Sequence, residues 1–498
     1  MSKLNDFEIK LRRFNLESKL EVCRMIAHSI EMNVPPPKPL KIFTNPQQKR
    51  ILSDLPKTSF IFEMEYMALA STINGEWKGS ISTLSDYEDF RKIINLYKDY
   101  GTAPKNEPLE GPEWYMNFIR LGLQQHKLSS LLYEDLVIYD YFYNFEDNSF
   151  NLKFLFEAKF KYDYKSYVLF VISLFTLSST LDKPLELETI LNSFSKLKQL
   201  NANMIIDMIN ILSATRDNIV DLHDQYKIPT RKYRNFDYNP YTKYPILKRS
   251  NKLFLPVPQY LFGAITEGFY HQLCEDGNLQ FREKFGKIVF EKYIGEILER
   301  YCKDLTIISE FEYGKEKKRS PDYILVKKKD IIFIEIKATT PAVSLRGNDF
   351  EVFKKQLIKG FGNGILQCIK KEYDLNNLLM KHTKFPKRWN NIYYMIIDLE
   401  DFHIPPGDLV TNTIKEFCEE NEVKYIEERK PLMLSVQLLI SIFEEFDGDI
   451  FDFMEIWSND KHIRFPDTYI DKSKVNVKEL SSYKYFGDII ESVRNNNE

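Results

Sequence analysis

The sequence predicts a mostly helical fold for the first half of the chain and an α/β fold for the second half. Two observations on the 498-residue chain favour this division. Apolar residues recur at helical spacing through much of residues 1–225, whereas from residue 261 helical patterns alternate with short strands rich in β-branched residues. Helices interleaved with such strands indicate a central sheet covered by helices. The composition, 43% hydrophobic and 28% charged, is typical of a folded globular protein.

The chain divides into four predicted parts. These are a mostly helical domain (1–225), a connector rich in proline, tyrosine and basic residues (226–260), an α/β domain (261–458) and a polar tail (459–498). No catalytic motif appears in the helical domain. We therefore expect it to regulate the protein, to bind a protein partner or to mediate self-association.

Within the helical domain, four segments give predictions of local structure. Residues 85–88 have the form of a helix capping box, and the apolar rhythm of 187–222 is helical. Residues 150–156 partly alternate, as a strand would. Residues 166–181 carry no charge but are shorter than the roughly 20 residues that span a bilayer. This stretch predicts a buried core helix and no membrane partner.

The connector allows two interpretations. Prolines interrupt any regular element, and tyrosines alternate with bases at 231–234 and 241–244. The favoured interpretation is an extended segment that lies over two domains. The alternative is an arm that contacts a nucleic-acid strand by aromatic stacking and phosphate pairing.

The α/β domain is predicted from a regular alternation of elements. Helices are expected over 261–273, 281–301, 353–373, 411–420 and 436–446. Strands are expected over 323–326, 331–336 and 391–399.

The most informative feature is a predicted β-hairpin. Two apolar strands flank a polar turn centred between Lys328 and Lys329. In that register Asp322 lies directly opposite Glu335, with Cβ atoms about 5 Å apart. Glu335 and Lys337 share one face of their strand, because side chains alternate with a period of two. Two carboxylates and one amine are therefore expected at one end of a sheet.

Two opposed carboxylates in an apolar sheet are destabilising unless another group neutralises them. A hard divalent cation would do so, since Mg²⁺ is commonly held by one or two carboxylates together with substrate phosphates. The alternative is an ion pair between Glu335 and Lys337 at an exposed sheet margin, with Asp322 merely ending a turn. The apolar neighbours of these residues favour the metal site.

The order of these residues resembles a known superfamily. Pro321-Asp322 followed by Glu335-x-Lys337 on an apolar strand is similar to the PD-(D/E)XK nucleases, and the resemblance is closest over 285–370. It implies a restriction-endonuclease-like core, a central mixed sheet flanked by helices. It also implies a metal-dependent nuclease that uses Mg²⁺, for which Mn²⁺ can substitute.

The resemblance also implies roles for the hairpin residues. Asp322 and Glu335 would bind the metal ion. Lys337 would position the attacking water or stabilise charge that develops on the phosphate in the transition state.

Two flanking helices complete the implied site. Glu291 lies at the edge of an apolar helical stripe and would be an auxiliary metal ligand, the alternative being a surface glutamate. On the helix after the hairpin, Gln367 would face the site, with Gln356 as the competing candidate.

Charge supports a nucleic-acid partner, with double-stranded DNA expected. Residues 315–390 hold 18 Lys and Arg against 8 Asp and Glu, whereas the whole chain has a net charge of −3. Phosphate neutralisation dominates the affinity of proteins for nucleic acid. The residues expected to bind it are Lys317, Lys318, Arg319, Lys354, Lys355, Lys359, Lys370 and Lys371.

These observations together predict a DNA endonuclease, similar to effectors of prokaryotic anti-phage defence. The five cysteines lie far apart without a CxxC pair, which favours the reducing cytoplasm. Three alternatives stay open. They are an RNase or single-strand-specific nuclease, a non-catalytic nucleic-acid-binding protein on the same fold, and an adaptor whose function lies in residues 1–225.

Overall fold

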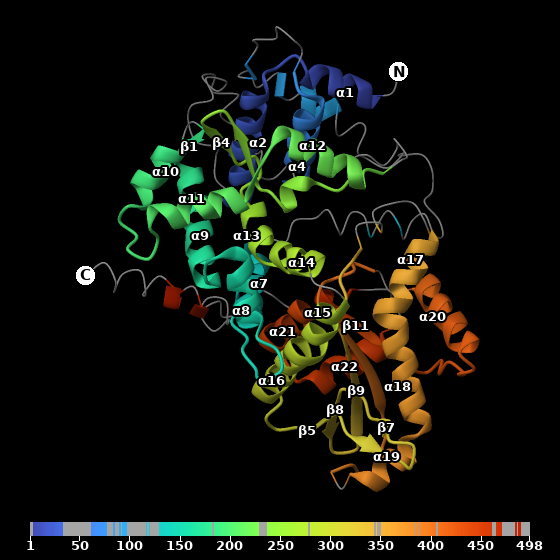
Figure 1. Cartoon of the computed structure of the whole chain (residues 1–498). Helices are drawn as coiled ribbons and strands as arrows, with labels where there is room; N and C mark the ends of the chain where they lie inside the picture. Colours follow the sequence, from blue (N-terminus) through green and yellow to red (C-terminus); the bar gives the residue numbers. More distant parts are fainter. Residues whose placement is uncertain are drawn as a thin grey trace.

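A computed structural model shows helices of the first half above a five-stranded sheet (Figure 1). The residues it describes are 3–32, 61–76, 83–84, 89–90, 92–96, 116, 119, 129–181, 184–228, 237–276, 279–342, 345, 350–382, 384–386, 388–404, 407–460, 465–470, 484–485 and 487–489. The predicted capping box at 85–88 and the basic tyrosine segment at 231–234 lie outside these residues.

The large sheet is mixed and confirms the predicted α/β architecture. Its strands are β5 (Thr306–Ser309), β8 (Tyr323–Lys327), β9 (Asp330–Lys337), β10 (Ile392–Asp398) and β11 (Leu432–Ser435). The order is β11-β10-β9-β8-β5. The pairs β5–β8 and β8–β9 are antiparallel, whereas β9–β10 and β10–β11 are parallel. The central strand β9 is apolar along most of its length because both of its faces are buried.

Helices cover both faces of this sheet (Figure 1). Ile332 and Ile334 of β9 belong to the core on one face, whereas Ile331 and Phe333 belong to the core on the other. The first face is covered by α16 (Glu291–Tyr301), α21 (Val436–Glu445) and α22 (Ile450–Asn459). The second is covered by α17 (Phe350–Leu357), α18 (Asn363–Tyr373), α19 (Leu375–Lys381) and α20 (Asp408–Glu420).

The two predicted long helices of this domain are confirmed, but each contains a π-helical turn. The first runs through α15 (Leu279–Lys284), η4 (Phe285–Phe290) and α16, and the second through α17, η6 (Ile358–Gly362) and α18. The predicted helix over 261–273 is divided into α13 (Tyr260–Ile265) and α14 (Glu267–Asp276). The division lies at Thr266, whose backbone leaves the helical region.

The N-terminal half is mostly helical, as predicted. Its helices are α1 (Lys3–Leu11), α2 (Leu16–Met32), α4 (Ile61–Asn74), α7 (Ser129–Tyr143), α8 (Leu152–Phe160), α9 (Tyr164–Thr180), α10 (Leu187–Phe194), α11 (Ala202–Ile211) and α12 (Arg216–Tyr226). The predicted core helix over 166–181 is α9. Among the described helices, none has both the length and the apolar character needed to cross a bilayer.

The strand predicted over 150–156 is wrong, since most of that segment begins helix α8. The Asn151 side chain accepts a hydrogen bond from the Phe154 backbone N–H and caps the helix. Only Phe156 and Leu152 of the apolar run are deeply buried there, at helical spacing. A local cap therefore outweighed the partly alternating pattern.

The prediction of an extended connector is wrong for residues 246–254. They form a hairpin, β3 (Ile246–Arg249) and β4 (Lys252–Phe254), at the centre of a second sheet with β1 (Leu185–Glu186) and β2 (Ser213–Thr215). Ser250 turns the hairpin with a φ of 55°. Tyr241 is buried and hydrogen-bonded to Thr72 at 2.7 Å, so its side chain is not part of a strand-contacting arm.

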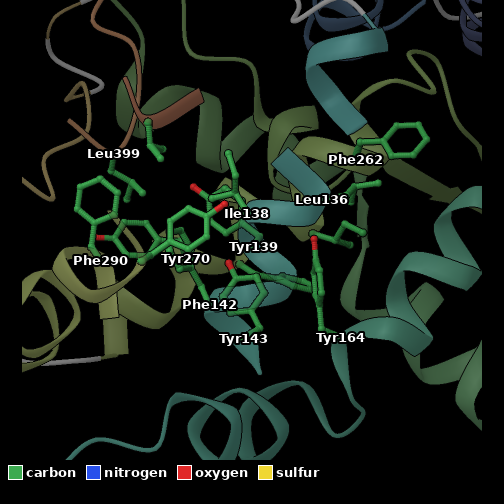
Figure 2. Packing of buried hydrophobic residues seen from close by; sticks show 14 of the residues in the cluster. Leu136, Ile138, Tyr139, Phe142, Tyr143, Tyr164, Phe262, Tyr270, Phe290 and Leu399 are labelled. Carbon is green, nitrogen blue, oxygen red and sulfur yellow. The ribbon is translucent and has the colours of Figure 1, made fainter. Parts of the chain in front are cut away.

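The hydrophobic cores do not separate at residue 225. Helix α7 shares one core with α9, with α13 and α14, and with the five-stranded sheet (Figure 2). The Phe142 ring lies 5.2 Å from those of Phe285 and Tyr293. A second core joins α1, α2 and α4 to the small sheet. The predicted boundary at 225 is therefore not a boundary between cores.

Part of the predicted polar tail also packs against the protein. The short helix η7 (Pro466–Tyr469) places the Tyr469 ring against Phe453, and Ile470 is buried in the core of α7. The Tyr469 hydroxyl donates to Asp460 at 2.5 Å. The tail is thus only partly peripheral.

The contact of α16 with β8 yields a stability prediction. An added Cβ at Gly295 would lie 2.2 Å from the Tyr323 hydroxyl, which donates to the backbone carbonyl of Glu291. We expect Gly295→Ala to lower the free energy of unfolding by about 1–3 kcal/mol, because the ring must leave this position. Gly263→Ala is the matched control, since no atom lies within 4 Å of its added Cβ. Thermal denaturation of both variants checks this, and equal stability would contradict it.

Candidate active site

The predicted register of the β8–β9 hairpin is confirmed. Tyr323 pairs with Ile334 and Lys327 with Asp330, so the turn lies between the two strands where the sequence places it. Asp322 directly precedes β8, one position beyond the last pair. It therefore lies across from Glu335 at the end of the hairpin.

Asp322 is anchored to the neighbouring strand. Its Oδ2 accepts a hydrogen bond from the Ile336 backbone N–H at 2.7 Å, and its side chain is 12% exposed. Burial raises the pKa of this carboxyl above its ordinary value, although the Ile336 N–H and Lys337 oppose the shift. Asp322 is thus a buried part of the sheet and does more than end a turn.

Lys337 connects the hairpin to the following helix. Its Nζ donates to Glu335 Oε2 at 2.9 Å and to Gln367 Oε1 at 2.7 Å. The sequence left open whether Gln367 or Gln356 faces the site. Gln367 contacts Lys337, whereas Gln356 lines the cleft described below. The Glu335–Lys337 ion pair of the alternative interpretation does exist. It does not lie at an exposed margin, because the two side chains are 6% and 19% exposed.

Glu291 lies at the rim of the site, as its helical position predicts. Its Oε2 is 2.9 Å from Lys287 Nζ, which also lies 3.1 Å from Glu310 Oε2 and 4.0 Å from Asp322 Oδ1. Lys287 and Glu310 were not recognised in the sequence. The sequence contained a signal for Lys287, because it precedes Glu291 by four residues and such residues form ion pairs on a helix.

The electrostatics of the site are those of acids crowded into a buried place. Burial, reinforced by the charge of Asp322, raises the pKa of both Glu335 and Glu291 to about 7. Burial alone would lower the pKa of the Lys337 ammonium, but Glu335 and Asp322 raise it above its ordinary value. Both glutamates therefore hold their protons more tightly than an exposed glutamate does.

Asp322 and Glu335 are the residues that would hold a divalent cation. In the described part of the chain, no group of three or more His, Cys, Asp or Glu side chains is arranged to hold a metal ion. Asp322 and Glu335 supply two hard carboxylates, the number that Mg²⁺ commonly takes from a protein when phosphate and water complete its shell. Glu291 instead pairs with Lys287, and its role as an auxiliary ligand stays a prediction.

Asp398 is a further acidic residue beside the site. It ends β10 directly across from Lys337, is fully buried, and accepts a hydrogen bond from the Thr339 hydroxyl. Burial raises the pKa of its carboxyl well above the ordinary value. Gly360 of the π-helical turn lies against it, since a Cβ there would approach Asp398 Oδ2 to 3.4 Å. The sequence contained a signal for Asp398, because it is a charged residue at the end of an apolar strand.

A cleft of about 950 Å³ opens onto this site. Its floor includes Lys337, Glu291 and Lys287, together with residues 338–342 that follow β9. Its opposite wall comes from α4, α12, α13 and α14. The helical half thus lines part of one side of a cleft that reaches Glu291 and Lys337, whereas Asp322 and Glu335 are not among its lining residues.

The predicted basic residues lie mostly outside this cleft. Only Lys359 is among its lining residues. Lys318 is paired with Asp374 at 3.0 Å, and Arg319 lies 3.6 Å from Glu310. Lys371 acts electrostatically on Glu335. Of the remaining four, Lys354 is half-buried, whereas Lys317, Lys355 and Lys370 are exposed.

Comparisons with protein-family models, curated proteins and solved structures found no match for this chain.

The raised pKa values predict how stability depends on pH. A carboxyl whose pKa is higher in the folded than in the unfolded state binds its proton more tightly when folded, so stability falls as pH rises from about 4.5 to about 7. For Glu335 this loss is up to about 3 kcal/mol. Glu335→Gln removes it.

We therefore expect the melting temperature of Glu335→Gln, relative to wild type, to increase by a few degrees (about 2–5 °C) between pH 5 and pH 8. Both proteins are measured in EDTA so that no bound cation contributes. A difference that stays constant across this range would contradict the raised pKa of Glu335.

Proposed function

We propose that this protein is a metal-dependent phosphodiesterase that hydrolyses nucleic acid. The observation that carries the proposal is that Asp322, directly before β8, lies opposite Glu335 on β9. Glu335 is buried, the Asp322 side chain is 12% exposed, and the Lys337 ammonium is bound to Glu335. Burying ionisable acids lowers the stability of the folded state. Acids with pKa values shifted in this way cluster at binding and catalytic sites.

The order of elements supports a restriction-endonuclease-like core. A helix that carries Glu291 precedes the hairpin, and a helix that carries Gln367 follows it. Both residues reach the hairpin residues through Lys287 or Lys337. This is the arrangement that the resemblance to PD-(D/E)XK nucleases implies. By the same resemblance, action on DNA in a prokaryotic defence system belongs to the proposal.

Asp322 and Glu335 would hold Mg²⁺, or Mn²⁺ in its place. When bound, the ion supplies Lewis-acid polarisation of the phosphate and lowers the pKa of a bound water. Lys337 has one ammonium hydrogen beyond those directed at Glu335 and Gln367, which it can donate to a phosphate oxygen. Gln367 fixes the direction of that ammonium group. Fixed donors of this kind stabilise charge that develops in the transition state.

Cleavage assays test the proposal. Plasmid DNA, linear DNA and RNA are incubated with wild type, Asp322→Ala and Lys337→Ala in Mg²⁺, Mn²⁺ or EDTA. We expect wild type to cleave only with a metal ion and each variant to be at least about 100-fold slower, the usual effect of removing one transition-state donor.

Glu299→Ala is the matched control, because Glu299 is an exposed acid on α16 about two helical turns beyond Glu291. It should cleave like wild type. Cleavage in EDTA, or undiminished cleavage by Asp322→Ala, would refute the proposal. Binding of nucleic acid without any cleavage would favour a non-catalytic role.

A further inference from the structure

We infer that the cleft admits an unpaired nucleic-acid strand, with its phosphates toward Lys337 and its bases toward the helical wall. This inference rests on the proposed function and names the substrate class for the same site. It departs from the duplex that the sequence predicts. Four observations carry it: the size of the cleft, its uneven charge, a tyrosine pair with one exposed ring and a buried amide.

The size of the cleft suits one strand. Cavities of about 300–1,000 Å³ hold single small ligands, and this one has about 950 Å³. A few nucleotides fit such a space. A duplex carries two backbones side by side and needs a correspondingly larger site.

Charge is distributed unevenly over the described residues that line the cleft, which are nine Asp or Glu and five Lys or Arg. Three of the five bases, Lys287, Lys337 and Lys359, lie on the floor, where they attract phosphate although acids lie beside them. The helical wall is the more acidic side, and its carboxylates, among them Glu65 and Glu267, repel phosphate. Carboxylates can accept hydrogen bonds from the exocyclic amines of bases, and unpaired bases offer these groups freely. This uneven distribution therefore orients a strand with its backbone on the floor.

An aromatic pair, the exposed Tyr226 and the partly buried Tyr238, lines the same cleft. Tyr226, at the end of α12, is 39% exposed, and its ring lies 5.3 Å from that of Tyr238 at an angle of 66°. Proteins that bind single strands use such rings as stacking surfaces, which accept any base. A duplex keeps its bases stacked on one another and cannot use these rings.

A buried amide provides a further contact for a ligand. Gln259 lines the cleft and is 1% exposed. Its Nε2 donates to the Ala27 carbonyl at 3.1 Å, which fixes the orientation of the amide, and its Oε1 accepts no hydrogen bond from any described residue. A buried acceptor without a donor is unfavourable. The exocyclic amine of a base, or a ribose hydroxyl, would supply that donor.

Binding measurements separate this inference from the proposed function. The probes are fluorescein-labelled single strands of DNA and RNA of about 12 nucleotides, and a DNA hairpin duplex of the same sequence. Fluorescence anisotropy is recorded on the full chain in EDTA, so that no cleavage occurs. We expect at least one of the single strands to bind about tenfold or more tightly than the duplex.

Tyr226 variants test the stacking surface. Tyr226→Ala should weaken single-strand binding about tenfold, whereas Tyr226→Phe, which keeps the ring, should bind like wild type. Tyr373→Ala is the matched control, because Tyr373 is an exposed tyrosine on α18 that does not line the cleft. It should also bind like wild type.

The outcomes are distinct. Equal or tighter binding of the duplex, or unchanged single-strand binding by Tyr226→Ala, overturns the inference even if the protein is a nuclease. Single-strand binding that depends on the Tyr226 ring supports it even if the cleavage assays fail and the proposed function is abandoned.

Discussion

The arrangement of the site depends on the pairing of β8 with β9. This register sets Asp322 across from Glu335, and the hydrogen bond from the Ile336 N–H to Asp322 holds the start of one strand against the end of the other. A slip of one residue would turn Glu335 and Lys337 to the opposite face. Apolar side chains on both faces of β9 oppose such a slip, so the same burial that builds the sheet also fixes its acids.

Two helices approach these acids closely, and both do so at π-helical turns. Gly286 lies against Ala338, and Gly360 against Asp398 and Thr339. A π-helical turn shifts the residues that follow it around the helix axis, and such turns often mark functional sites. Here they precede the helical segments that carry Glu291 and Gln367. The resulting site is crowded with charge, and Lys287 and Lys337 offset part of it.

The sequence predicted the hairpin and its two flanking helices because these features are local. A turn centre and a period of two define the register, and a helical wheel places Glu291 at the rim of the apolar face. Asp398 had a local signal, since it ends an apolar strand, but its place beside Lys337 depends on strand order. Glu310 approaches the site from a loop, for which no local pattern gave a signal. The cleft was missed for the same reason, since its walls come from segments far apart in the chain. The strand predicted at 150–156 failed because a single cap residue decided the conformation.

Helix α7 has a consequence for how the protein can be divided. Its aromatic side chains pack at once against the N-terminal helices and against those next to the sheet (Figure 2). A cut in the chain near residue 225 would strip the sheet-bearing fragment of this helix and expose a broad aromatic surface to water. Because the two halves share this core, we expect them to fold and unfold as one unit.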